Sequence, residues 1–181
     1  MELIYKVTDM DISNELTLLN NPDIRYGARG IVINDKGEIA LFNKSNKNEY
    51  KLPGGGVEEN EDLELAFKRE AMEETGCEIE IIKKLGTIEE HKGKTNFKQV
   101  SHVFVAKVIK DTGKLNLTEK EAKEGAKLMW VKPSEALRLI TECYDNLIPS
   151  ETETLYMSKF IVTRDRKILE YYLENEKNLG D

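Results

Sequence analysis

Apolar residues along the chain follow two spacings, which predict strands interleaved with helices. Leu3, Tyr5 and Val7 alternate with polar residues, and this pattern indicates a strand near the start of the sequence. The β-branched run at 25–34 leads into Asp-Lys-Gly at 35–37, a turn sequence that predicts a hairpin with the next apolar run. The predicted strands cover residues 3–7, 25–34, 38–43, 50–53, 78–88, 99–109 and 127–131.

Three stretches have the composition and the end signals of helices. Residues 61–75 are strong helix formers without Gly or Pro, and Gly76 is a natural C-terminal stop. A short helix is predicted over 133–140. The sequence Ser150-x-x-Glu153 is a capping box at the head of an additional C-terminal helical segment at about 150–175. This order of elements predicts an α/β (α+β) fold in which helices pack on the faces of a mixed sheet.

Composition and charge narrow the class of protein. The 181 residues are 39% hydrophobic and 34% charged, which fits one globular domain over 1–181. No apolar run approaches the roughly 20 residues of a membrane span, and no secretory signal precedes the first strand. Two cysteines make no disulfide framework, so we expect a cytoplasmic protein without a membrane partner. The net charge of −7 and the lack of a basic patch argue against a nucleic acid polymer as partner.

The helix at 61–75 places three carboxylates on one face. At 3.6 residues per turn, Glu70, Glu73 and Glu74 fall within an arc of about 100°. The alternative interpretation is a solvated acidic face, which most Glu-rich helices have. That interpretation fits poorly, because the apolar residues Ala66 and Phe67 share or border the same arc. Hard oxygen ligands at this density suit Mg²⁺, with Mn²⁺ as the alternative.

Two neighbouring features strengthen the interpretation of this helix as a metal site. Gly54, Gly55 and Gly56 directly precede it, and glycines allow main-chain groups to approach a ligand closely. Arg69 is an i,i+4 neighbour of Glu73 and is placed to orient it. Taken alone, the glycines also fit an ordinary flexible loop, and Arg69 also fits simple charge relief.

Together these residues resemble the Nudix box, a motif with the pattern G-x5-E-x7-R-E-U-x-E-E-x-G-U, where U is a bulky aliphatic residue. The match runs without a gap over residues 55–77, and its only departures are the small residues Ala71 and Cys77 at U positions. The positions that match are Gly55, Glu61, Arg69, Glu70, Glu73, Glu74 and Gly76.

The resemblance implies a Nudix-type α/β/α sandwich around a mixed β-sheet and a metal-dependent hydrolysis of the diphosphate linkage in a nucleoside diphosphate bound to another moiety. It implies that Glu70, Glu73, Glu74 and the Gly54 carbonyl bind the metal ion. Glu73 and Glu74 are also expected to act in catalysis. The remaining box residues are expected to have structural or orienting roles, and they are Gly55, Glu61, Arg69 and Gly76.

Some members of the family contribute a further Glu from a loop ahead of a Trp-bearing strand. Glu124, six residues before Trp130, resembles that arrangement and is our candidate for an extra catalytic base or ligand, with Glu121 as the alternate. The competing interpretation is that 119–124 forms an exposed charged helix.

Substrate contacts are harder to predict from the sequence. Arg29 and Lys44 are candidates for phosphate binding, and Tyr50 and Phe97 are candidates for stacking on a base, although such residues are often surface charges or core aromatics. The favoured substrate is a small-molecule nucleotide, namely a nucleoside triphosphate, including an oxidatively damaged one. The alternatives are a nucleotide sugar, ADP-ribose, or a non-catalytic regulator of the same fold.

The apolar residues of the C-terminal segment recur at near-helical spacing. A helix with this pattern either packs on the sheet of its own chain or forms a homodimer contact.

Overall fold

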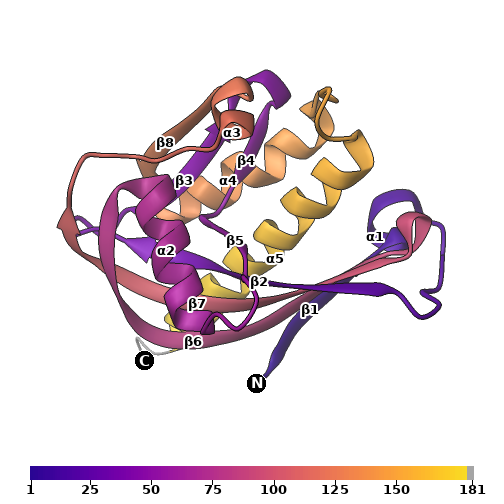
Figure 1. Ribbon diagram of the computed structural model, residues 1–181, viewed down its shortest axis with the longest axis horizontal. Helices are drawn as coiled ribbons and strands as arrows, with labels where there is room; N and C mark the ends of the chain where they lie inside the picture. The colour runs from indigo at the N-terminus through magenta and orange to yellow at the C-terminus, as the bar shows by residue number, and fades with distance from the viewer. Residues whose placement is uncertain (179–181) are drawn as a thin grey trace.

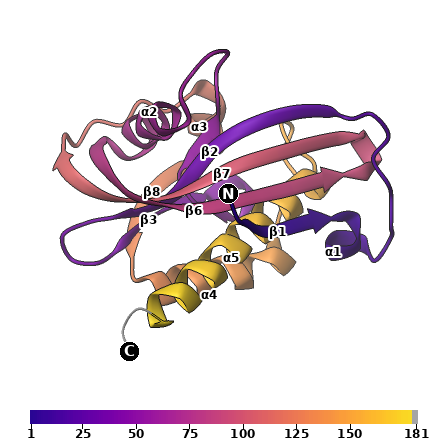
Figure 2. The ribbon, with the colours of Figure 1, turned by 90° about the horizontal axis from the view of Figure 1, so that it is seen from below.

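Eight strands form one mixed sheet, and helices cover both of its faces (Figure 1). The computed structural model describes residues 1–178. Helix α2 (Leu63–Thr75) lies over one face, and α4 (Pro133–Cys143) and α5 (Leu155–Asn178) lie over the other, as the view along the sheet edge makes clear (Figure 2). The predicted sandwich of helices around a mixed sheet is confirmed.

The strand order is β1-β6-β7-β2-β3-β4, with β5 paired to β2 and β8 paired to β3. Strands β2 and β7 run parallel, while β6 and β7 form a long antiparallel pair. The strand bounds are β1 Leu3–Thr8, β2 Asp23–Ile33, β3 Ile39–Lys44, β4 Glu49–Lys51, β5 Gly54–Gly56, β6 Cys77–Lys92, β7 Phe97–Asp111 and β8 Ala126–Val131. Short helices lie at α1 Asp9–Ser13 and α3 Glu119–Lys123, and 3-10 turns lie at Ser45–Lys47, Gly93–Thr95 and Tyr144–Asn146.

Alternation along β2 divides the core into two halves. Ala28 and Val32 belong to the apolar cluster under α2, whereas Ile31 belongs to the cluster under α4 and α5. Successive side chains of a strand point to opposite faces, so a single strand supplies both clusters. The same alternation directs Arg29 to the side of the sheet that α5 covers.

Helix α2 begins two residues later than the pattern predicts. The side chain of Asp62 accepts hydrogen bonds from the main-chain N–H groups of Glu64 and Leu65, so Asp62 is the N-cap. At the other end Gly76 adopts φ 69°, the left-handed conformation that glycine takes without steric cost, and ends the helix as predicted.

The predicted start of the C-terminal helix is wrong. Helix α5 begins at Leu155, where the Thr154 hydroxyl accepts a hydrogen bond from the N–H of Met157. The Ser150 hydroxyl instead accepts from the N–H of Glu153 within a turn that precedes the helix. Such a turn satisfies the same local hydrogen bonds as a capping box, so the two are hard to separate by sequence.

Helix α5 buries its apolar side in its own chain. Phe160, Ile168 and Leu169 are fully enclosed in the cluster beneath α4 and α5. Within residues 1–178, no helix is long and apolar enough to cross a membrane.

Candidate active site

The last turns of α2 carry the three carboxylates, and Glu74 is the most enclosed of them. It is only 3% exposed. The N–H of Gly54 donates to its Oε2 at 2.9 Å, and the Lys51 Nζ lies 3.6 Å from its Oε1. Burial raises the pKa of Glu74 to about 7, although Lys51 and the Gly54 N–H act in the opposite direction. A cation placed beside such a buried carboxylate stabilises its ionised form.

Glu70 occupies space that a glycine leaves free. A Cβ atom on Gly55 would lie 2.5 Å from the Glu70 carboxylate, closer than van der Waals contact allows. The backbone of β5 therefore approaches the carboxylate only because position 55 has no side chain.

Arg69, on helix α2, forms hydrogen bonds with Glu61 in the segment before the helix and with Glu70 on the helix itself. Its Nε and Nη2 donate to the two oxygens of Glu61 at 2.8 and 2.9 Å, a bidentate pair. Its Nη1 donates to Glu70 at 2.7 Å, and its Nη2 also donates to the Gly56 carbonyl. The hydrogen bond from Arg69 holds the pKa of Glu61 at about 2. Glu73, the neighbour predicted for Arg69, lies farther away, at 3.7 Å from Nη1.

Glu73 is the most accessible of the three acids. Its side chain is 35% exposed. Partial burial and the nearby charge of Glu70 raise the pKa of Glu73 above its usual value. Within the described part of the chain, no group of three or more acidic, His or Cys side chains converges closely enough to hold a metal ion without some movement of the side chains. The donor set nevertheless fits a hard cation, since all three side chains offer carboxylate oxygens and like charges raise the pKa at Glu73.

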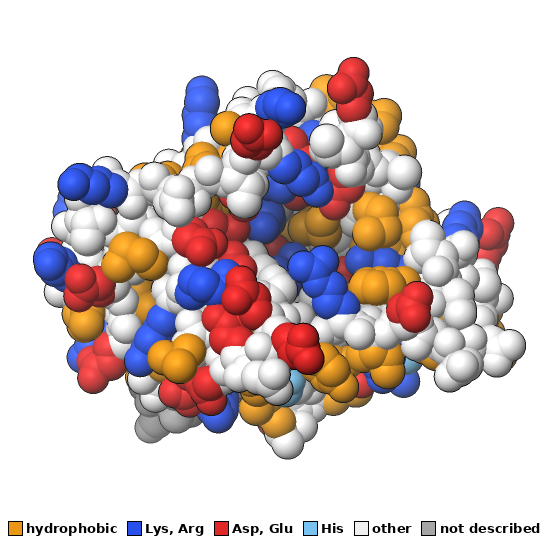
Figure 3. All heavy atoms as spheres, in the orientation of Figure 1, with side chains coloured by type: hydrophobic (Ala, Val, Ile, Leu, Met, Phe, Trp, Pro, Cys, Tyr) orange, Lys and Arg blue, Asp and Glu red, His pale blue; other side chains and the backbone are white. Residues whose placement is uncertain are grey.

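A cavity of about 270 Å³ opens beside α2. Acidic side chains gather over α2, next to a hollow whose walls carry Lys and Arg side chains (Figure 3). The lining residues come from β2, β3, β4, β5, α2, β7, α3, α5 and the segments beside them: Arg25, Arg29, Lys44, Lys51, Gly54, Gly55, Gly56, Glu70, Glu74, Gln99, Thr118, Lys120, Glu121, Glu153, Ile161 and Arg164.

The four predicted substrate-binding residues divide into two pairs. Arg29 and Lys44 both line this cavity. Tyr50 does not line it and instead packs against the core cluster beneath α5. Phe97 also lies outside the cavity lining, and its ring is covered by the Lys92 ammonium, 5.6 Å from the ring centroid. Neither aromatic side chain therefore lines the cavity beside α2.

The two candidate glutamates near α3, Glu121 and Glu124, lie in different surroundings. Glu124 is 3% exposed and is surrounded by cations, with the Lys44 Nζ at 2.6 Å and the Lys47 Nζ at 3.5 Å. The Thr152 hydroxyl donates to it as well. Burial raises the pKa of Glu124, but these contacts lower the pKa by more than burial raises it, so the net shift is downward. Glu121 instead lines the cavity and is held by its hydrogen bonds from Thr118.

Sequence reasoning did not single out Arg25, Lys51, Gln99 or Arg164. A signal for Gln99 was available, because it stands on the same face of β7 as the core residues Val103 and Val105. Arg164 had no comparable signal, since a basic residue in a charged helix is ordinary.

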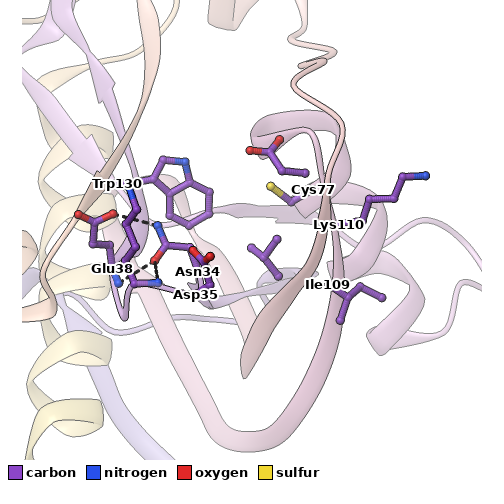
Figure 4. Close-up of a pocket in the computed structure, with 10 residues that line it drawn as sticks. Asn34, Asp35, Glu38, Cys77, Ile109, Lys110 and Trp130 are labelled. Carbon is purple, nitrogen blue, oxygen red and sulfur yellow. Dashed lines mark hydrogen bonds between the residues drawn. The ribbon is translucent and has the colours of Figure 1, made fainter.

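A larger cavity of about 620 Å³ lies elsewhere, between the β2–β3 turn, the end of β7 and Trp130. Asn34, Glu38 and Trp130 form one side of it, and Cys77 lies across from them (Figure 4). None of the three α2 glutamates lines this cavity.

Comparison with known proteins places the chain in a family. A model of the NUDIX domain matches residues 23–150. The chain is 26% identical over 117 residues to a "MutT-like protein" of Streptomyces ambofaciens, covering 64% of this chain and 68% of that protein. It is 33% identical over 107 residues to a "Putative 8-oxo-dGTP diphosphatase" of Bacillus subtilis (strain 168), covering 59% of this chain and 66% of that protein.

Solved structures share the fold at low sequence identity. The MutT protein of Methanosarcina mazei Go1 is 22% identical, with a TM-score of 0.52 over 87% of this chain and 99% of that one. The ORF135 protein of E. coli is 20% identical, with a TM-score of 0.54 over 88% of this chain and 95% of that one. The chain therefore belongs to the NUDIX family and is a Nudix-type pyrophosphohydrolase, a class of enzyme that generally uses divalent metal ions.

Proposed function

We propose that this protein hydrolyses the diphosphate linkage of a nucleoside triphosphate with the help of Mg²⁺. The observation that carries the proposal is the position of Glu70 and Glu74, which line the same cavity as several Lys and Arg side chains. Phosphoanhydride hydrolysis depends mainly on charge stabilisation and on the placement of a water molecule. A cavity lined by both carboxylates and cations can provide the charge stabilisation and a place for the water.

Glu70, Glu73 and Glu74 would hold the metal ion, and the Gly54 carbonyl is a further candidate ligand. When bound, the ion supplies charge neutralisation for the phosphate oxygens and lowers the pKa of a coordinated water. Glu61 and Arg69 would orient the helix that carries these ligands, since Arg69 joins Glu61, Glu70 and the Gly56 carbonyl.

The basic residues of the cavity would bind and orient the substrate. Arg29 and Lys44 are placed to contact its phosphates. Glu121 is our candidate for the group that accepts the proton of the attacking water, because it lines the cavity. Glu124 is the weaker candidate, since Lys44 and Lys47 neutralise it.

A nucleoside triphosphate, including an oxidised one, is the substrate class that the cavity supports best. The surplus of cations over acids along its lining suits several phosphate groups. The name of the Bacillus subtilis relative refers to 8-oxo-dGTP and points to the same class. We also propose a cytoplasmic location, which suits the two free, buried thiols of Cys77 and Cys143.

A panel of nucleoside triphosphates, their 8-oxo forms and nucleotide sugars, assayed with Mg²⁺ for release of pyrophosphate or phosphate, tests this function. We expect turnover of at least one triphosphate by the wild type. We also expect a loss of at least about 10²-fold in Glu73→Gln, because that variant removes one carboxylate ligand of the metal site. No turnover of any compound, or equal rates in wild type and variant, would refute the proposed function.

A further inference from the structure

Helix α5 lies outside the part of the chain that the NUDIX model matches, yet it forms one wall of the cavity. The matched region ends at residue 150, and α5 begins at Leu155. Ile161 and Arg164, from the middle of α5, line the cavity together with residues of the matched region. The helix therefore shapes the part of the site that lies beyond the carboxylates.

Arg164 is buried but keeps donors that no acid uses. It is 4% exposed, and its Nε donates to Asp165 at 2.7 Å while its Nη1 donates to Glu90 at 3.2 Å. Among the described residues, no hydrogen bond is made by its Nη2. The two acids hold the guanidinium plane in place, and the side chain borders the cavity. A guanidinium fixed in this way is ready for bidentate binding of an oxyanion.

Arg29 faces the same space from the sheet. It is 4% exposed, and its only side-chain hydrogen bond among the described residues runs from Nε to the Ser101 hydroxyl at 2.9 Å. It forms no salt bridge within 4.0 Å in the described part of the chain. Arg29 and Arg164 are both buried and line the same cavity, so an anion bound between the two guanidinium groups would be stabilised by both.

The absence of a side chain at position 27 lets polar groups of β7 lie close to β2. Gly27 lies between Arg25 and Arg29 on β2, and a Cβ there would lie 2.7 Å from the amide nitrogen of Gln99. Gln99 and Ser101 project from the paired strand β7. The result is a strip of hydrogen-bond donors on one face of the sheet, with no aromatic ring in the cavity lining.

We propose that Arg29 of β2 and Arg164 of α5 form a subsite for a third phosphate group, in addition to the two that flank the hydrolysed linkage. The enzyme would then select substrates by the number of their phosphates, and prefer a nucleoside triphosphate to the corresponding diphosphate. Arg29 connects the two parts of the site, because it pairs with Gly54 of β5 in the sheet and lines the same cavity as Glu74 and Arg164. This inference rests on the proposed function.

The test compares Arg164→Gln with Arg166→Gln, a matched change on the same helix at a residue that does not line the cavity. Steady-state kinetics with Mg²⁺ would use one nucleoside triphosphate and its diphosphate. We expect Arg164→Gln to raise KM for the triphosphate by at least about 10-fold and to change KM for the diphosphate by less than about 3-fold. Arg166→Gln should leave both values unchanged. Equal effects of Arg164→Gln on the two substrates, or no effect on either, would overturn the inference.

Calorimetric titration with inorganic tripolyphosphate in metal-free buffer provides a readout that does not need turnover. Arg164→Gln should weaken binding at least about 10-fold relative to wild type and Arg166→Gln. If no nucleotide is hydrolysed but this loss is seen, the subsite stands and the proposed function fails. If nucleotides are hydrolysed but tripolyphosphate binding does not change, the function stands and the subsite fails.

Arg164 has buried acidic partners, so its replacement can prevent folding. Arg29→Gln is the second variant, since it removes a guanidinium without leaving Glu90 or Asp165 unpaired. It should weaken tripolyphosphate binding to a similar extent. Unchanged binding in a folded Arg29→Gln protein also contradicts the inference.

Discussion

The main-chain N–H of Leu52 donates a hydrogen bond to Oδ2 of Asp165 at 2.8 Å, across 113 positions of the sequence. Leu52 stands two residues before Gly54, so this bond joins α5 to the segment that enters the glycine strand. The other oxygen of Asp165 accepts from Arg164. One fully buried carboxylate thus positions both the backbone that leads into β5 and a guanidinium that lines the cavity.

Replacement of Asp165 by Ala should destabilise the fold and impair the site together. It leaves the buried N–H of Leu52 and part of Arg164 without an acceptor, and we expect unfolding to become easier by about 3 kcal/mol. Urea denaturation measures this change. Asp145→Ala, at an exposed position, is the control and should shift stability by less than about 0.5 kcal/mol. Asp165→Asn keeps an acceptor for Leu52 and should cost less than the Ala variant; equal costs would argue against the role of this hydrogen bond.

Gly55→Ala should reduce activity more than stability. Its Cβ would lie 2.5 Å from the Glu70 carboxylate, so the carboxylate or the strand has to move. Because Gly55 does not have a left-handed φ, Ala adopts its backbone conformation without strain. We expect kcat to fall at least about 10-fold and the Mg²⁺ concentration for half-maximal rate to rise, as expected for displaced ligands.

The matched control is Gly37→Ala in the β2–β3 turn. Nothing lies within 4 Å of a Cβ at that position, although its φ of +73° adds strain. This variant should lose about 1 kcal/mol of stability and keep full activity. Similar rates in the two variants would show that contact with Glu70 is unimportant.

Much of the carboxylate helix was predictable from sequence, because its chemistry is local. Spacing along one helix decides which of its residues share a face, and Glu74 is indeed buried beside Ala66 and Phe67. The Gly76 stop depends on a single residue's backbone freedom, and the structure confirms it.

The other half of the cavity was not predictable in this way. Glu124 and Glu121 stand three residues apart, and only the fold reveals that Lys44 and Lys47 surround the first of them. Arg164 and Asp165 act on Glu90 and Leu52, partners that are remote in the sequence. Tyr50 likewise turned out to belong to the core, because an aromatic residue in a strand fits a core and a ligand site equally well.

The pH dependence of stability should carry the signature of Glu74. Its pKa is about 7 in the folded protein, against an ordinary value of 4.5. Between these values Glu74 binds a proton in the folded state that it has released in the unfolded state. Its contribution to the free energy of unfolding is therefore highest below pH 4.5 and declines as the pH rises to about 7. The decline amounts to roughly 3 kcal/mol.

Thermal denaturation of metal-free wild type and Glu74→Gln across pH 4 to 8 measures this contribution. The stability of the variant relative to wild type should increase with pH over that window. Addition of Mg²⁺ should reduce the difference, because a cation stabilises the ionised carboxylate. Parallel curves for the two proteins would mean that Glu74 titrates normally.

Replacement of Glu121 by Gln should lower activity with little loss of stability, whereas replacement of Glu124 by Gln should lower stability with little loss of activity. Glu121 lines the cavity, and its loss as proton acceptor should lower kcat by at least about 10²-fold. The cost in stability should stay within about 1 kcal/mol, because the exposed capping box loses only its charge. Glu124 pairs with Lys44 and Lys47. Its replacement by the neutral Gln leaves these two buried ammonium groups with less negative charge beside them. Glu124→Gln should therefore lose about 2 kcal/mol of stability and change kcat less than about 3-fold.

Steady-state kinetics and urea denaturation of the two variants, measured side by side, decide between them. The pH profile of kcat adds a readout that a purely structural role does not change. Its acidic limb should change in Glu121→Gln and persist unchanged in Glu124→Gln, because the ionisation of the proton acceptor contributes to that limb alongside the ionisation of the metal-binding glutamates. If the limb changes instead in Glu124→Gln, the buried glutamate is the base, and the ion pairs with Lys44 and Lys47 must open during each catalytic cycle.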